Sequence, residues 1–135
     1  MKIKLIDFGY KKLPYRAHEN DAGADVYTTT EAIIRPGQTV KMPLGFGLMI
    51  PDGYAGYIFP RSGLSSKGIV CELPPIDSGY RGEINAIVSN VGLEPYTVEK
   101  LERIGQLVIL PVIIADFITT DINERGTDAF ASTGR

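Results

Sequence analysis

Hydrophobic and polar residues alternate with a period of two in several short runs along the chain. These runs are rich in Val, Ile, Tyr and Thr and are separated by Gly, Pro, Asn or Asp, a composition typical of β-strands and the turns between them. The pattern predicts strands at residues 2–8, 26–30, 39–50, 54–59, 83–90 and 106–114. Their regular spacing favours an all-β barrel or sandwich.

Helical periodicity is missing over any long window, and the best candidate is one short helix at 64–67. The longest apolar run, 107–115, is much shorter than a membrane span and is expected to form a core strand. After Ile122 the apolar content falls abruptly, so we expect a compact core over 1–122 and a mobile segment over 123–135.

Length and composition narrow the choice of function. A chain of 135 residues fits one domain, and a net charge of −2 leaves no basic field for a nucleic-acid partner. Cys71 is the only cysteine and His18 the only histidine, which excludes an intrachain disulfide and a Cys/His zinc cluster. No signal peptide or membrane segment is recognisable, and the expected location is cytoplasmic.

Two stretches carry candidate chemistry. In "PRSGLSSKGI" (60–69), Arg61, Ser62 and Gly63 offer a guanidinium group, a hydroxyl and an approachable backbone N–H, which together suit a phosphate oxygen. In "IDSGYRGEI" (76–84), a hairpin would present Asp77 and Tyr80 on a concave face. Taken singly, each stretch has a plainer interpretation, as a turn with a surface arginine or as a hairpin with a polar tip.

Other residues extend this set. Polar groups suited to phosphate and a second aromatic ring are present at Gln106, Arg125, Phe130, Ser132 and Thr133. Such a set is suited to binding a planar base and a polyphosphate while activating water. It includes no protein cage for a metal, so a divalent ion would be held by phosphate oxygens and water.

Five stretches, in order along nearly the whole chain, resemble the motifs of the trimeric dUTP diphosphatases (dUTPases). They are "AGADVYT" (22–28), "PRSGLSSKGI" (60–69), "PPIDSGYRGEI" (74–84), "ERIGQLVI" (102–109) and "RGTDAFASTGR" (125–135). The resemblance implies a distorted jelly-roll subunit with one short helix, a homotrimer with three shared active sites, and magnesium-dependent hydrolysis of dUTP to dUMP and pyrophosphate.

The resemblance also implies a role for each matching residue. Asp77 matches the general base that directs water at the α-phosphorus, and Tyr80 matches the ring that excludes a ribose 2′-hydroxyl. The phosphate-side positions are Arg61, Ser62, Gly63 and Gln106, and Asp25 supports arginine and metal-bound water. Uracil would be read mostly by backbone groups of the hairpin between Cys71 and Asn85, which includes Ile76. In the segment 123–135, a flexible lid, Phe130 would stack on uracil while Arg125, Ser132 and Thr133 reach the terminal phosphates.

The chain departs from the family pattern in three places. Pro74-Pro75 removes backbone donors ahead of Asp77, Cys71 stands where some members carry asparagine, and Asp128, Ala129 and Ala131 replace glycines around Phe130. Two alternative functions stay open. One is dCTP deamination, in which Ile87 would occupy the position of a required glutamate; the other is a regulatory protein on a dUTPase scaffold, with a protein partner, as in certain phage members.

Overall fold

The computed structural model describes residues 1–122, which form ten short strands and one helix. Long alternating segments are divided by glycine and proline turns, so most strands span only three to six residues. In chain order the elements are β1 (Lys4–Asp7), β2 (Ala24–Tyr27), β3 (Ala32–Ile34), β4 (Thr39–Pro43), β5 (Phe46–Met49), β6 (Tyr54–Phe59), α1 (Ser62–Ser65), β7 (Ile69–Cys71), β8 (Asn85–Asn90), β9 (Tyr96–Val98) and β10 (Arg103–Pro111).

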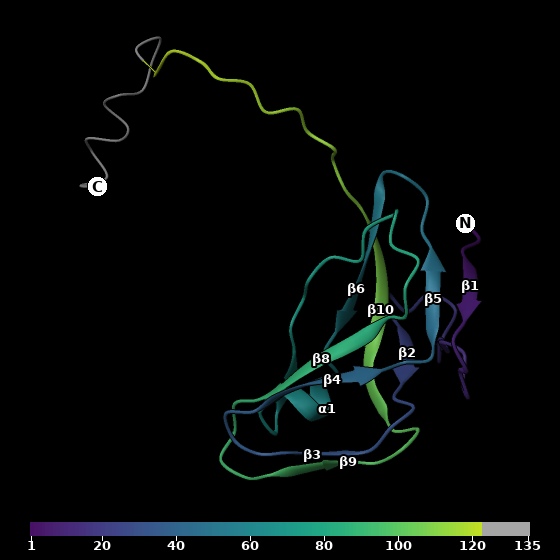
Figure 1. The fold of residues 1–135 in the computed structure, drawn as a ribbon, viewed down its shortest axis with the longest axis vertical. Helices are drawn as coiled ribbons and strands as arrows, with labels where there is room; N and C mark the ends of the chain where they lie inside the picture. Colours follow the sequence, from purple (N-terminus) through teal and green to yellow (C-terminus); the bar gives the residue numbers. More distant parts are fainter. Residues whose placement is uncertain (123–135) are drawn as a thin grey trace.

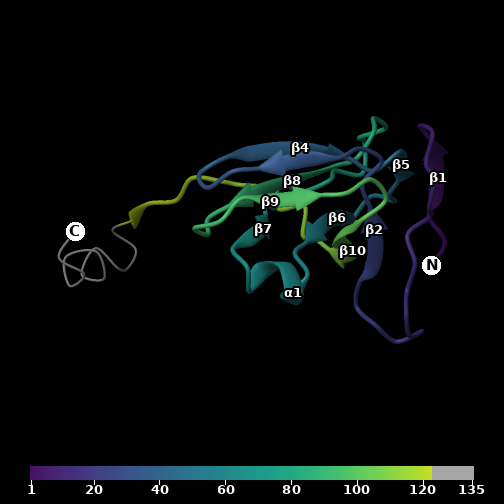
Figure 2. The same ribbon diagram turned by 90° about the horizontal axis from the view of Figure 1, so that it is seen from below.

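All strand pairs are antiparallel and belong to four small sheets (Figure 1). Two sheets have three strands, in the orders β2-β10-β6 and β4-β8-β7, and the other two are the pairs β1-β5 and β3-β9. Figure 2 shows β4 and β8 in one layer and β6 and β10 in the layer beneath, with α1 below them. Within the described residues the sheets do not close into a barrel.

The core lies between these layers. In several strands alternate residues point inward, as the period of two requires; on β8, for example, Ala86 and Val88 are fully buried. The largest buried side chains are Phe46, Ile34, Met42, Leu44, Leu48, Ile69 and Ile104. The apolar alternation in the sequence therefore marks the surface that holds the two layers together.

The strand predictions are confirmed in position but not in every boundary. The predicted strand over 39–50 is wrong as a single element, because Gly45 has φ +82° and divides it into β4 and β5. Strands β3, β7 and β9 were not predicted, since three-residue strands give too short an alternation to recognise. The helix was expected at 64–67 but is α1, which begins two residues earlier.

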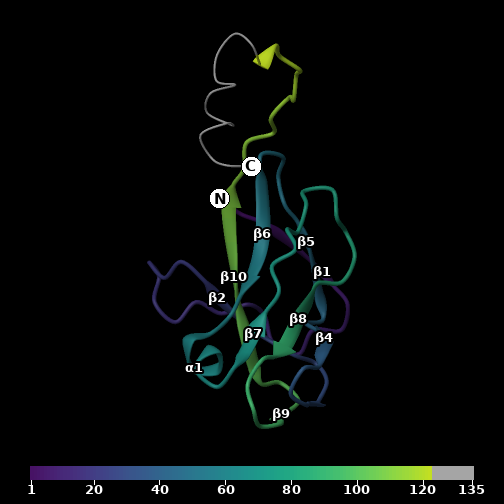
Figure 3. The same cartoon turned by 90° about the vertical axis from the view of Figure 1, so that its left-hand side faces the viewer.

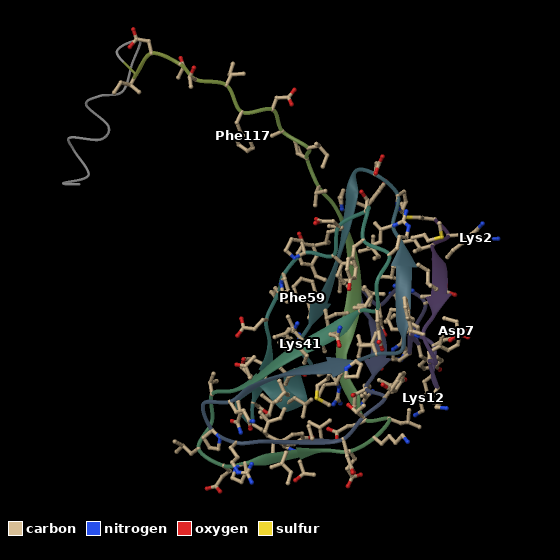
Figure 4. The ribbon with its side chains drawn as sticks, viewed as in Figure 1. Lys2, Asp7, Lys12, Lys41, Phe59 and Phe117 are labelled. Atoms are coloured by element: carbon tan, nitrogen blue, oxygen red, sulfur yellow. The ribbon has the colours of Figure 1, made fainter. Side chains whose placement is uncertain are left out.

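The C-terminal end of β10 corrects a second expectation. A core strand was predicted over 107–115, yet β10 ends at Pro111 and the chain then leaves the body of the protein (Figures 1 and 3). Ile113 is 91% exposed and Phe117 95% exposed, and Figure 4 shows Phe117 well away from the sheets. The apolar residues of this segment therefore do not contribute to the core of their own chain.

Candidate functional site

The segment between β7 and β8 carries the predicted hairpin. Its first half is attached to β6 through a pair of backbone hydrogen bonds between Ile76 and Gly56, at 2.8 and 3.0 Å. A turn follows, in which the Tyr80 N–H donates to the Asp77 carbonyl at 3.0 Å. The Ser78 hydroxyl donates to the Asp52 carboxylate at 2.9 Å, which fixes the turn against the loop before β6.

Asp77 and Tyr80 line the same pocket, which has a volume of about 250 Å³. Both side chains are exposed, so a ligand in the pocket can reach them. The remaining wall combines apolar side chains with three charged ones and one amide, and comprises Lys41, Ile58, Glu72, Pro74, Pro75, Ile76, Glu83, Ile84, Asn85 and Ile87. The structure therefore brings together a carboxylate, an aromatic ring and a hollow large enough for part of a nucleotide.

The end of the hairpin is held at Glu83 and Ile84. The Ile84 N–H donates to the Phe46 carbonyl at 2.8 Å, and the Glu83 carboxylate accepts a 3.0 Å hydrogen bond from the Gly45 N–H. The Glu83 carbonyl accepts the hydroxyl of Tyr80 at 2.9 Å. The side-chain amide of Asn85 donates a longer hydrogen bond, of 3.4 Å, to the same carbonyl.

A second group of residues lies around β10, and we call it the arginine group: the predicted Asp25, Arg61 and Gln106, together with Arg103. Arg103 makes a 3.2 Å ion pair with Asp25 on β2, whose side chain is 18% exposed. Arg61 precedes α1 and donates to the Arg103 carbonyl at 3.2 Å. Ser62 and Gly63 are exposed in the first turn of α1, beside Arg61.

Gln106 lies at the centre of the arginine group. It is opposite Asp25 on β2 and Phe59 on β6, and its side-chain amide donates to the Pro60 carbonyl at 3.2 Å. Gly23 leaves it room: a Cβ atom at Gly23 would lie 2.4 Å from the Gln106 side-chain oxygen. The glycine of "AGADVYT" is thus explained by the close approach of this glutamine.

Cys71 lies at the end of β7, beside β10. Its half-buried thiol is directed at the Ile104 carbonyl, 3.9 Å away, and burial followed by the nearby Glu72 charge raises the pKa of the thiol to about 11. Cys71 is not part of the pocket wall around Asp77. Any contact of this residue with a base would therefore have to come from the backbone rather than from the sulfur.

The two groups of residues are separate in the single chain. None of Asp25, Arg61 or Gln106 lines the Asp77 pocket in the described part of the chain. Figure 1 shows the connection between β7 and β8 running beside β6, away from α1. We call the pocket with Asp77 and Tyr80 the hairpin group, and each group supplies only part of the predicted site.

Sequence reasoning missed several residues of both groups. Arg103 lies within "ERIGQLVI" but was not selected, although its position opposite the Asp25 strand becomes evident only from the sheet register. Lys41 reaches the pocket from β4, which is distant in sequence, whereas Glu72 and Glu83 lie at the two ends of the β7–β8 connection and were not selected. Arg125, Phe130, Ser132 and Thr133 lie outside the described residues.

The donor set does not form a metal cage. Residues 1–122 contain no group of three or more His, Cys, Asp or Glu side chains that can hold an ion, and the Asp25 carboxylate is already paired with Arg103. Such a set is compatible with a divalent ion only if most of the ion's oxygen ligands come from phosphate and water. In the same range, no helix is both long and apolar enough to cross a membrane.

Comparison with known proteins identifies relatives over nearly the whole chain. A family model described as dUTPase matches residues 9–134. Deoxyuridine 5′-triphosphate nucleotidohydrolase of Tropheryma whipplei is 43% identical over 129 residues, covering 90% of this chain and 88% of the relative. The protein of the same name from Clostridium tetani is 40% identical over 141 residues, covering 100% of this chain and 97% of the relative.

Solved structures of two phage dUTPases have the same fold as this chain. The dUTPase of Staphylococcus aureus phage phi11, in which a structural Mg(II) ion is coordinated, superposes with a TM-score of 0.83 at 22% identity and covers 90% of this chain and 97% of its own. The dUTPase of Staphylococcus phage 80alpha, described as controlling transfer of virulence genes, superposes with a TM-score of 0.82 at 26% identity. The match covers 89% of this chain and 96% of the phage protein. The jelly-roll prediction is confirmed, and with the sequence relatives it establishes that this chain belongs to the dUTPase family.

Proposed function

We propose that the protein hydrolyses dUTP to dUMP and pyrophosphate. The oxygen of a water molecule forms a bond to the α-phosphorus, and the bond from that phosphorus to the oxygen bridging to the β-phosphorus breaks. The electron pair of that bond leaves with pyrophosphate, and the water loses its protons to Asp77 and solvent. The observation that carries this proposal is the shared pocket of Asp77 and Tyr80 in a chain of this family.

Asp77 is the residue that acts on the water. Its carboxylate is exposed at the mouth of the pocket, while the backbone around it is fixed by the Ile76–Gly56 pairing and the Tyr80 N–H bond. An aspartate is a weak base near neutral pH, so holding the water in line with the α-phosphorus is expected to contribute much of its effect. Tyr80 forms the wall against which the deoxyribose lies.

The arginine group is suited to the triphosphate. Arg61 and Arg103 supply positive charge, and Ser62 and Gln106 supply neutral donors beside them. Arginine binds phosphate with two parallel hydrogen bonds, which fixes direction as well as charge. Magnesium bound to the phosphate oxygens would neutralise further charge, with Asp25 close to its water ligands.

We propose that the site is completed in a homotrimer, since the family's members are trimeric. Two features support this arrangement. The hairpin group and the arginine group do not meet within one chain, and Ile113, Ile114, Phe117 and Ile118 expose apolar side chains that a neighbouring subunit would cover. The predicted lid, with Phe130 on uracil and Arg125, Ser132 and Thr133 on phosphate, would then close over a neighbour's site.

The alternatives differ in what they require. Deamination of dCTP needs a proton-transferring side chain where Ile87 lines the pocket, and isoleucine has none to offer. A regulatory role has a precedent in the phage 80alpha dUTPase, which is described as controlling gene transfer. A protein partner of that kind, and a cytoplasmic location, stay predictions for this chain.

The test is release of pyrophosphate from dUTP, compared with dCTP, dTTP and UTP, in the presence of magnesium. We expect selective cleavage of dUTP, and a fall of about 10³-fold in kcat for Asp77→Asn because the amide neither holds nor deprotonates water as a carboxylate does. Asp52→Asn is the matched control, since Asp52 contacts the same hairpin through Ser78. It should retain most of the activity.

Two results would contradict the proposal. If the unaltered protein releases ammonia from dCTP, it is a deaminase. If it binds dUTP without cleaving it, the scaffold serves binding alone.

A further inference from the structure

We infer that Glu83 is a positioning residue that sets the place of the Tyr80 ring and thereby the discrimination of deoxyribose from ribose. The inference rests on the proposed function, and it concerns a pocket-lining residue to which that function gives no role. Glu83 connects the ring to a fixed point in the body of the protein through two of its own groups, one in the side chain and one in the backbone.

The side-chain connection is to Gly45. The Glu83 carboxylate accepts the Gly45 N–H at 3.0 Å, and the pair is partly buried, where a charged acceptor strengthens the bond. Gly45 cannot shift easily: it has φ +82°, its carbonyl accepts the Phe8 N–H at 2.9 Å, and a Cβ atom there would lie 2.7 Å from the Tyr10 backbone. The turn between β4 and β5 is therefore a rigid anchor.

The backbone connection is to Tyr80. The Tyr80 hydroxyl donates to the Glu83 carbonyl at 2.9 Å, although the residue is 47% exposed overall. The hydroxyl end of the ring lies over Gly82, where a Cβ atom would be only 2.5 Å from the hydroxyl oxygen. Gly82 in turn is held close to β5, because a Cβ at Gly47 would lie 2.8 Å from the Gly82 carbonyl.

These contacts form one continuous connection from Gly45 through Glu83 to the tip of the ring. An exposed ring without it would have freedom to swing away from the pocket. Because a wall excludes a 2′-hydroxyl only when it stands within van der Waals distance of the sugar, a displacement of about 1 Å is enough to reduce selectivity. Loss of the Glu83 side chain should therefore affect sugar choice more than it affects the chemical step.

The experiment compares kcat/KM for dUTP and UTP in four variants. Glu83→Ala removes the bond to Gly45 and should reduce the dUTP:UTP ratio about tenfold, whereas Glu83→Gln keeps a neutral acceptor and should stay within about threefold of the unaltered protein. Tyr80→Phe keeps the ring but removes its bond to Glu83, and should lower the ratio similarly. Glu31→Ala, at an exposed carboxylate outside the pocket, should leave the ratio unchanged.

Combining Glu83→Ala with Tyr80→Phe sharpens the test. If both act on the same connection, the double variant loses little more selectivity than either single variant. An unchanged ratio in Glu83→Ala, or an equal loss in Glu83→Gln, would overturn the inference, the second because it would indicate that the charge itself acts on substrate. Circular dichroism verifies that each variant is folded.

Failure of the inference is distinguishable from failure of the proposed function. If the unaltered protein cleaves dUTP and Glu83→Ala keeps its sugar selectivity, only the inference is wrong. If the unaltered protein cleaves no dUTP, the proposed function is wrong, and the inference is then judged by calorimetric affinities for dUMP and UMP. In that case Glu83→Ala must narrow the difference in affinity for the inference to stand.

Discussion

The hairpin group and the arginine group are held in place by different means. Asp77 and Tyr80 lie in a turn without helix or strand. This turn is attached to the body through backbone bonds at Gly56 and Phe46 and through the Glu83 carboxylate, which accepts the Gly45 N–H. The arginine group projects from the paired strands β2 and β10, whose register shifts between Arg103 and Gly105, and from the residue before α1. In the proposed function, the residues that would contact the base and sugar depend on backbone position, whereas the residues that would contact phosphate depend on side chains fixed to strands or beside α1.

This difference affects tolerance to substitution. Beside the hairpin group, Gly47 on β5 and Gly82 permit close approaches that any side chain would block. In the arginine group the partners are charged or amide side chains, so conservative replacement preserves geometry but changes charge. We expect the first group to be sensitive to volume and the second to be sensitive to charge.

The largest effect is expected when the hairpin group is inactivated in one chain and the arginine group in another. Asp77→Asn and Arg61→Ala should each reduce kcat by at least about 10²-fold, since the first removes the proposed base and the second removes a positive charge that would stabilise the phosphates. If each site combines the hairpin group of one subunit with the arginine group of another, refolding the two variants together should restore up to about a quarter of the unaltered activity.

The measurement is pyrophosphate release before and after mixing, with each variant refolded alone as the control. Absence of recovery, although mixed trimers are shown to form by mass spectrometry, would place both groups of one site in the same chain.

A smaller effect is expected from Gly23→Ala. The new methyl group would overlap the Gln106 side chain, and such overpacking typically costs about 1–3 kcal/mol. Gln106 should be displaced from the Pro60 carbonyl, which weakens phosphate binding and raises KM for dUTP more than it lowers kcat. Steady-state kinetics tests this, with Ala22→Ser as an adjacent exposed control; a KM unchanged in Gly23→Ala would show that the glutamine does not contact substrate.

The smallest effect concerns the pH dependence of stability, and it involves two residues close to the arginine group. Burial raises the pKa of Cys71 to about 11 from 9.0, and burial together with the hydrogen bond to Glu102 raises the pKa of Tyr96 to about 12 from 10.0. Both residues contact the start of the β10 region, at the Ile104 carbonyl and the Glu102 carboxylate. Since the folded state holds these protons more tightly, their contribution to stability is complete below pH 9 and is lost as pH rises to about 12.

Urea unfolding at a series of pH values measures this loss. Cys71→Ala should give a shallower fall in the free energy of unfolding between pH 9 and 11. An identical slope in the variant would mean that the thiol ionises equally in the folded and unfolded states.

Much of the fold was predictable because burial on one face of a strand leaves a period of two in the sequence. The strand at 54–59 was predicted with its exact ends, whereas the strand over 39–50 was not, because a single glycine with positive φ interrupts an otherwise continuous alternation. The exposed residues after Pro111 could not be recognised, since apolar composition is the same whether a segment packs inside its own chain or elsewhere.

For the candidate site, residues adjacent in sequence were found and residues joined only by sheet register were not. Asp77 and Tyr80 lie three residues apart on one turn, so their proximity follows from the sequence alone. Arg103 and Asp25 are 78 residues apart and meet only because β2 pairs with β10. Glu83 was overlooked for the same reason, since its partner Gly45 belongs to another turn.

In the proposed trimer, the apolar segment that leaves the body after Pro111 would make part of the stability of each chain depend on assembly. A monomer would present Ile113, Phe117 and Ile118 to water, so the free energy that these side chains contribute is available only when a second chain receives them. The melting temperature should therefore rise with protein concentration, as mass action requires. Newly made chains would remain only partly stabilised until they encounter one another, which makes the rate of synthesis in the cell a determinant of how much active protein accumulates.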